Sequence, residues 1–350
     1  MHDRLKLITK SKLFWPLMIL VLMIIFNIIF VDDFLSIEFK DGHLFGRIID
    51  IINRAAPLML LAMGMTLVIA TGGVDLSVGS TAAISGALVC SLIGGNFDGT
   101  VQNPFIIAII AALFVSILAG AWNGFLVGKL GIQPVVATLI LYVAGRGIAQ
   151  LITGGQIITV YYKPYAYLGG FAPGIPIPFS IIIAAVVLVI VLLALKKTAL
   201  GLFIESVGVN SVASRFTGIS VVKIKFLVYA FSGLCAGIAG LIISSMIRAA
   251  DANNAGLMSE MDAILAVAIG GTSMAGGRFS LGASMIGALI VQSITTTLYA
   301  VGVSAQVLPL IKAIVVIAIC FVQSEELRHK LSGIFSKIGG ARNEKATVKL

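Results

Sequence analysis

Charged residues are scarce in this sequence. Only 11% of the 350 residues are Asp, Glu, Lys or Arg, whereas 59% are hydrophobic. Because a soluble domain carries about 25% charged residues, this composition excludes an ordinary water-facing surface. We therefore expect an integral membrane protein.

Cysteine and histidine are scarce as well, which limits the available chemistry. The three cysteines, Cys90, Cys235 and Cys320, lie far apart in apolar runs. This pattern fits neither a metal site nor a disulfide framework, and it predicts buried thiols. None of the three histidines lies in a long apolar run. A serine nucleophile inside the membrane would lack its usual base, which disfavours an intramembrane enzyme.

A nucleotide-binding loop is also missing. The pattern G-x-x-x-x-G-K-[ST], whose backbone N–H groups cradle phosphates, occurs nowhere in the 350 residues. We expect this chain to bind no cofactor, so that any ATP-driven step needs a second polypeptide.

Long apolar runs make up most of the chain. About 20 helical residues cross a hydrocarbon core of about 30 Å, and lipid leaves no partner for unpaired backbone groups. We therefore predict an all-α polytopic membrane protein with about ten transmembrane helices, some of them interrupted or re-entrant. Its 38 glycines predict close helix packing. The predicted spans are 13–31, 52–71, 79–95, 104–127, 132–152, 177–195, 225–247, 260–276, 280–302 and 306–322.

The basic residues predict the orientation of these spans. The net charge is +9, and most lysines and arginines fall in segments that ten spans place on one side, chiefly 1–12, 196–224 and 323–350. Short cytoplasmic segments retain such residues, so both termini are expected in the cytoplasm. The domain organisation is then an N-terminal segment 1–12, one transmembrane domain 13–322 and a C-terminal tail 323–350. This distribution explains the charge without a nucleic-acid partner.

The inner segment 196–224 reads as two short helices separated by a turn. Apolar residues recur at helical spacing, Gly208 can end the first helix, and Asn210 or Ser211 can cap the second. Such a segment would form a rigid projection on the cytoplasmic face. Its candidate contact residues are Leu202, Phe203, Glu205, Gly208, Asn210 and Arg215.

Four motifs in order resemble one family. They are "GMTLVIATGGVDLSVGS" (64–80), "PVVATLILYVAGRGIAQLITGG" (134–155), "ALGLFIESVGVN" (199–210) and "AILAVAIGGTSMAGGRFSLGAS" (263–284). Together they are similar to permease subunits of bacterial ABC importers for monosaccharides, the ribose-type family. The stretches "GHLFGRIIDIINRAAPLMLLAMGMTLVIATGG" and "RAADANNAGLMSEMDAILAV" resemble galactofuranose importer permeases most closely.

The resemblance implies an import machine in the bacterial inner membrane. Two permease subunits, identical or paralogous, would form the path for a monosaccharide. A periplasmic binding protein would deliver the sugar, and a cytoplasmic ATPase would supply ATP and magnesium. Segment 196–224 would be the coupling loop seated in that ATPase. We expect Gly208→Trp to leave the protein folded but uncoupled.

The stretch "TGGVDLSVGS" (71–80) interrupts the apolar sequence. Glycines weaken a helix there, and a charged Asp75 facing lipid would cost about 2.5–3.5 kcal/mol at mid-bilayer. One interpretation is a part of the translocation pathway or its inner gate. The other is a cytoplasmic turn in which Asp75 or Ser77 caps the next helix. The pathway candidates are Thr71, Gly72, Gly73, Asp75, Ser77, Asn123 and Gln150.

Other polar residues within spans are expected mainly to hold helices together. An ion pair between Arg146 and Asp262 is one such expectation. The tyrosine-rich segment 154–176 is expected on the outer side as a lid or docking surface.

Two other functions compete with the importer subunit. An ion-driven secondary sugar transporter would be expected to show paired intramembrane carboxylates or histidines and inverted repeats. A receptor or scaffold would need no rigid projection on the cytoplasmic face.

Overall fold

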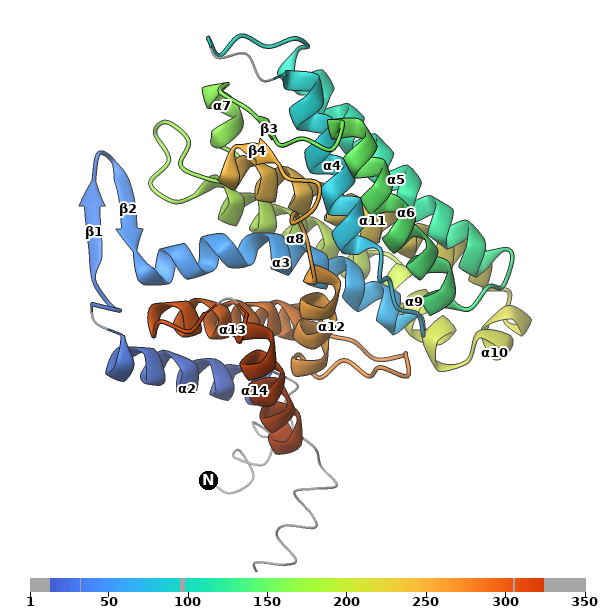
Figure 1. Cartoon of the computed structure of the whole chain (residues 1–350). Helices are drawn as coiled ribbons and strands as arrows, with labels where there is room; N and C mark the ends of the chain where they lie inside the picture. The colour runs from blue at the N-terminus through green and yellow to red at the C-terminus, as the bar shows by residue number, and fades with distance from the viewer. Residues whose placement is uncertain (1–12, 32, 95–97, 305, 324–350) are drawn as a thin grey trace, which may run out of the picture.

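The protein is almost entirely helical, as expected. The computed structural model describes residues 13–31, 33–94, 98–304 and 306–323, and this part contains thirteen helices and four short strands (Figure 1). The helices are α2 (Phe14–Phe30), α3 (Arg47–Ala70), α4 (Val78–Ile93), α5 (Phe105–Gly128), α6 (Pro134–Thr153), α7 (Lys163–Ala166), α8 (Phe179–Lys197), α9 (Leu200–Val209), α10 (Ser211–Phe216), α11 (Val221–Ile247), α12 (Ser259–Ile269), α13 (Leu281–Ala300) and α14 (Leu308–Gln323). The strands are β1 (Ile37–Lys40), β2 (His43–Gly46), β3 (Ile158–Thr159) and β4 (Ala249–Ala250).

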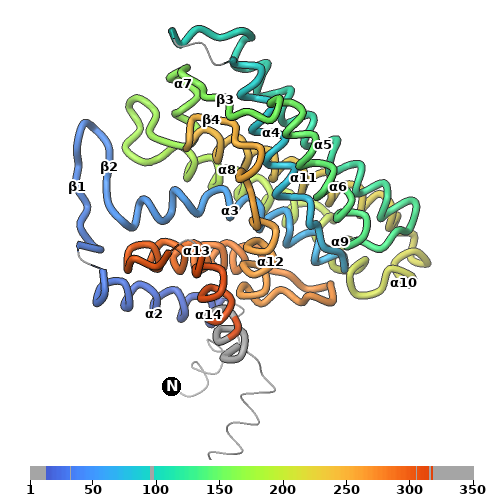
Figure 2. Tube along the Cα trace, in the orientation of Figure 1, coloured from blue at the N-terminus to red at the C-terminus, as the bar shows by residue number. Residues whose placement is uncertain are grey.

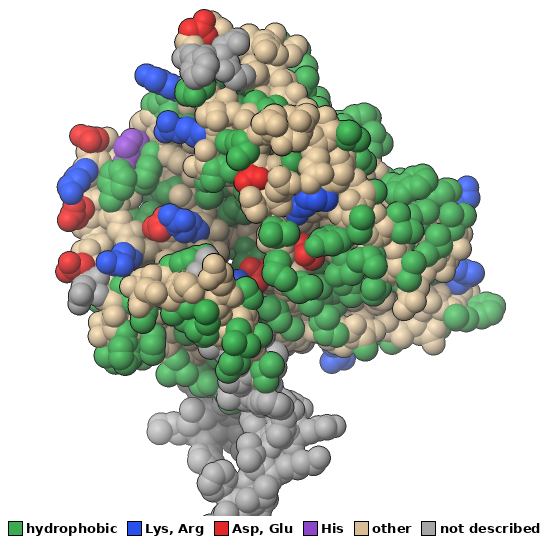
Figure 3. Space-filling model, viewed as in Figure 1, with side chains coloured by type: hydrophobic (Ala, Val, Ile, Leu, Met, Phe, Trp, Pro, Cys, Tyr) green, Lys and Arg blue, Asp and Glu red, His purple; other side chains and the backbone are tan. Residues whose placement is uncertain are grey.

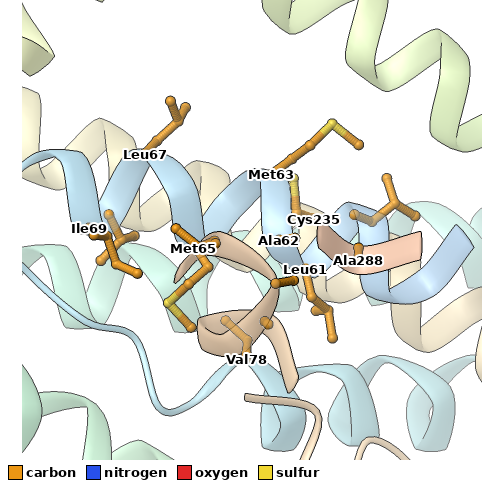
Figure 4. Packing of buried hydrophobic residues seen from close by; sticks show 14 of the residues in the cluster. Leu61, Ala62, Met63, Met65, Leu67, Ile69, Val78, Cys235 and Ala288 are labelled. Atoms are coloured by element: carbon orange, nitrogen blue, oxygen red, sulfur yellow. The ribbon is translucent and has the colours of Figure 1, made fainter. Parts of the chain in front are cut away.

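Helix α3 forms the centre of the molecule. Every residue from Ala55 to Ala70 is buried, so this helix is apolar on all sides. Its side chains point in several directions, and the same core contains Val78 of α4, Cys235 of α11 and Ala288 of α13 (Figure 4). An element packed on all sides can transmit a displacement from one end of the molecule to the other.

The helices on one side of α3 pack very closely. Helices α4, α5, α6 and α11 run obliquely to α3, and α13 and α2 lie along its other side (Figure 2). A methyl group on Gly120 of α5 would come within 2.9 Å of the Cα atom of Gly233 on α11. Glycine thus allows the two backbones to approach, as its abundance predicted.

The outer helices expose apolar side chains. Large hydrophobic residues of α5, α6 and α8 are exposed, including Ile106, Phe114, Ile140 and Ile190. Hydrophobic side chains also cover the surface over α5 and α6 (Figure 3). Six helices of the described part, α3, α5, α6, α8, α11 and α13, are long and apolar enough to cross a membrane. The chain is therefore a multi-pass membrane protein.

Each of the ten predicted spans contains a helix, but only six helices of the described part are long and apolar enough to cross a membrane. Helices α2, α4, α12 and α14 are shorter. Helix α4 has 16 residues, and α12 has 11 where 260–276 was predicted. Eleven residues rise only about 16 Å, so α12 is a half-length helix. Residues 270–280 after it form an irregular loop. The predicted segments 1–12 and 324–350 lie outside the described residues, and so does the side chain of Cys320.

Two short sheets were not anticipated. Strands β1 and β2 form an antiparallel hairpin before α3, and β3 pairs with β4. The second pair joins the predicted outer segment 154–176 to the end of α11. Tyr165 in this segment is fully buried, so at least this part is packed against the bundle.

Candidate functional site

The predicted coupling loop folds as two helices with a turn between them. Helix α9 ends at Val209, and α10 begins at Ser211. The side-chain oxygen of Asn210 accepts hydrogen bonds from the backbone N–H groups of Val212 at 3.0 Å and Ala213 at 2.9 Å. Of the two predicted caps, Asn210 is confirmed. Gly208 lies inside α9 and does not end it, because the helix continues to Val209.

Gly208 joins this loop to the core. A methyl group at Gly208 would collide with the carbonyl oxygen of Ala70 and the backbone nitrogen of Gly277. The Gly277 N–H in turn donates to the Ala70 oxygen at 2.9 Å. The expectation that Gly208→Trp leaves the fold intact is therefore wrong, because even one added carbon has no space. Helix α9 rests directly on the end of α3.

A groove opens on the exposed side of α9 and α10. Its volume is about 420 Å³. Leu202 beside it is 65% exposed, and Arg215 is exposed. Phe203 instead packs against the core, so it anchors the loop. The groove is lined by Leu202, Glu205, Ser206, Val209, Asn210, Ala213, Ser214, Thr217, Ile219 and Arg278.

Asp75 forms a buried polar cluster between α3 and α4. The residue is 1% exposed, and one carboxylate oxygen accepts from the Ser77 hydroxyl at 2.6 Å and the Ser77 N–H at 3.1 Å. The other oxygen accepts from the Ser232 hydroxyl of α11 at 2.8 Å. Asn123 of α5 donates to the Ser77 oxygen at 2.8 Å. The cluster thus links the segment before α4 to α11 and to α5.

This geometry bears on both interpretations of residues 71–80. The break in the helix is present, between Ala70 and Val78. The Ser77 side chain makes no cap hydrogen bond to α4, and Asp75 accepts a hydrogen bond from the backbone N–H of Ser77, the residue before the helix. In this conformation Asp75, Ser77 and Asn123 contact protein, so a role in a gate remains a prediction.

The remaining pathway candidates lie at two places. Thr71 donates to a carbonyl of α3 at 2.8 Å, Gly72 adopts a φ of 78°, and Gly73 is buried. All three follow directly after α3, at the end where α9 packs against it. Gln150 is exposed on α6 and donates to the Asn253 side chain at 2.6 Å. It is therefore the only one of the seven candidates to present an exposed polar side chain in the described structure.

The expected ion pair between Arg146 and Asp262 is not formed. Arg146 donates to the carbonyl oxygens of Ala252 at 3.0 Å and Ala255 at 2.6 Å. Asp262 instead pairs with Lys312 of α14, with nitrogen–oxygen distances of 2.9 and 3.1 Å. The sequence could not indicate this partner, because α12 and α14 meet only in the folded bundle.

Sequence reasoning missed a recess between α3 and α13. Two adjoining pockets of about 330 and 390 Å³ lie there and share Asp50, Thr296 and Ala300. We call them together the α3–α13 recess. Arg54 donates to Asp50 at 2.8 Å, and Gln292 donates to Thr296 at 3.3 Å. The available signal was the i,i+4 spacing of both polar pairs on apolar helices.

These features define a membrane transport subunit. The described part combines a buried central helix, a surface groove on α9 and α10, and a polar recess. Residues 47–321 match the family described as the permease component of the branched-chain amino acid transport system. The chain belongs to this permease family.

The relatives are sugar permeases by name. The galactofuranose transporter permease protein YtfT of Escherichia coli K12 is 47% identical over 94% of this chain and 96% of its own length. The fructose import permease protein FruF of Bifidobacterium longum is 41% identical over 95% and 92%. The ribose import permease protein RbsC of Escherichia coli K12 is 35% identical over 80% and 86%. No solved structure matches the chain. These relatives support an importer subunit over a secondary transporter.

Proposed function

We propose that this chain is the membrane subunit of an ABC importer for a monosaccharide of the galactofuranose type. The single observation that carries the proposal is the seating of α9 on the end of α3, with a groove on its opposite, exposed side. A partner that fills the groove would push directly on the central helix. The relatives support the sugar class, and 47% identity to the galactofuranose permease favours that sugar.

The partner in the groove would be a cytoplasmic ATPase that binds ATP and magnesium. Glu205, Arg215 and Arg278 give the groove region both charge signs, and Leu202 gives it an apolar anchor. Helix α3 has 24 residues and is therefore about 36 Å long. Movement of α9 by nucleotide-dependent closure would reach the opposite end of the molecule through this one helix.

Two further partners complete the assembly. A second permease subunit, identical or paralogous, would complete the path for the sugar. A periplasmic binding protein would deliver the sugar at the end that carries the β1–β2 hairpin. Both termini would be cytoplasmic in the bacterial inner membrane, in accord with the distribution of basic residues.

The proposed binding of the ATPase in the groove is tested with the Leu202→Arg variant, by measuring how much ATPase copurifies with it from native membranes. We expect at least a tenfold loss of bound ATPase, which corresponds to about 1.4 kcal/mol. Phe39→Arg is the matched control, because Phe39 is 67% exposed and Leu202 is 65% exposed, but Phe39 lies in the hairpin. Equal capture of the ATPase by both variants would contradict the proposal.

The sugar is tested by uptake into cells that express the complete transporter. Labelled galactofuranose should enter at lower concentrations than ribose or fructose. Preference for either of those sugars would leave the importer class standing and overturn the galactofuranose assignment.

A further inference from the structure

The α3–α13 recess gathers groups of several chemical types at one end of the bundle. Asp50 supplies carboxylate acceptors, Arg54 supplies guanidinium donors, and Gln292 and Thr296 supply an amide and a hydroxyl. Tyr299, which is 54% exposed, adds an aromatic ring. Hydroxyl groups of a sugar need both donors and acceptors, and its C–H faces pack on aromatic rings.

The recess contains charged groups that lipid would not solvate. The side chains of Asp50 and Arg54 are 48% and 61% exposed although they are ion-paired. An exposed ion pair on a membrane helix faces a wet cavity or the interface region, since hydrocarbon would not solvate it. Charged side chains gather at the hairpin end of the molecule (Figure 3).

The recess also extends inward along α13. Gln292 lies eight residues before Ala300 on α13, so the polar lining descends by about 12 Å. Each pocket falls in the range of about 300–1,000 Å³ that holds small molecules. The depth and size suit one small polar ligand.

The position of the recess connects it to the docking groove. Asp50 and Arg54 lie near the first residue of α3, and Ala70, which contacts Gly208, is its last. Figure 1 shows the hairpin at one end of α3 and α9 at the other. A push on α9 would therefore move one wall of the recess against α13.

We propose that the α3–α13 recess is the entry site in which the permease holds a neutral monosaccharide, with Asp50, Arg54, Gln292 and Thr296 bonded to its hydroxyls. The inference rests on the proposed function and names a sugar-binding site within this subunit. It differs from the candidates at 71–80, which lie at the opposite end of α3.

The first test is sugar uptake by the Gln292→Ala and Asp50→Asn/Arg54→Gln variants of the complete transporter. We expect at least a tenfold drop in uptake, while ATPase activity stimulated by the loaded binding protein remains. Asp98→Asn is the control, because Asp98 is an exposed carboxylate in the loop after α4. The Thr100 backbone N–H holds the pKa of Asp98 below its usual range, so the control also removes a negative charge.

Unchanged uptake by both recess variants would overturn the site and leave the importer assignment intact. Loss of stimulated ATPase activity together with uptake would also overturn it, since that result would indicate a failure of coupling or assembly. Absence of sugar uptake by the unmodified transporter would instead contradict the proposed function.

The second test is chemical labelling of Thr296→Cys in a background that carries Cys320→Ser. Cys90 and Cys235 are buried, so the introduced thiol should react selectively with a membrane-impermeant maleimide. We expect labelling from the periplasmic side, and at least threefold slower labelling when the binding protein and galactofuranose are present. A thiol that does not react, or that the sugar does not protect, would overturn the entry site. Leu35→Cys, at an exposed position before the hairpin, controls for general shielding.

Discussion

At the level of single residues, Asp75 joins parts of the bundle that are distant in the sequence. Its carboxylate is bonded to serines of two segments that are 155 residues apart along the chain (Ser77 and Ser232). A cluster of this kind is stable only when every member keeps its partner. Removal of the carboxylate would leave buried donors without acceptors.

We therefore predict that Asp75→Leu destabilises the protein. Each buried donor left unpaired costs about 1–3 kcal/mol, so the melting temperature in detergent and the yield should both fall. Asp98→Leu removes an exposed carboxylate and should change neither. If Asp75→Leu melted at the same temperature as the unmodified protein, the cluster would not stabilise the fold.

At the level of elements, the close contact of α5 with α11 depends on glycine. A side chain at Gly233 would collide with the carbonyl oxygen of Ser116 on α5. Gly147 on α6 provides a contrast, because a methyl group there would meet no atom within 4 Å. The same residue type thus has different roles on two helices.

Gly233→Val should accordingly destabilise the bundle by about 1–3 kcal/mol, the usual cost of overpacking. Gly147→Val should be close to neutral. Thermal denaturation of the two purified variants in the same detergent measures the difference. Equal melting temperatures would mean that α5 and α11 can separate without cost.

At the level of the whole molecule, the hairpin and the coupling loop occupy opposite ends of α3 (Figure 1). The proposed orientation places the first outside the cell and the second inside. Two exposed apolar residues mark these ends: Phe39 at 67% and Val209 at 74% exposure.

We predict that Phe39→Cys reacts with an impermeant maleimide in intact cells, and that Val209→Cys reacts only after the membrane is opened. The two positions are similarly exposed in this chain alone, so the rates are compared in membranes that lack the ATPase, which the proposal places over Val209. The reverse pattern would invert the topology and remove the groove from the ATPase side.

The amino-acid sequence determined the class of protein and most of its local structure. Apolar runs of spanning length allow only helices in lipid, so the order of ten helices followed from composition and length. The cap before the second loop helix followed too, as Asn210 or Ser211, because capping depends on neighbouring residues. The same local signals identified the break near Asp75.

Only the tertiary structure decided which distant residues meet. Asp262 pairs with Lys312 and not with Arg146, Gly208 contacts Ala70, and the recess forms between helices more than 200 residues apart. Periodicity describes one face of one helix and carries no information about its neighbour. Contacts between helices depend instead on crossing angles and on the fit of side chains, which exist only once the bundle has packed.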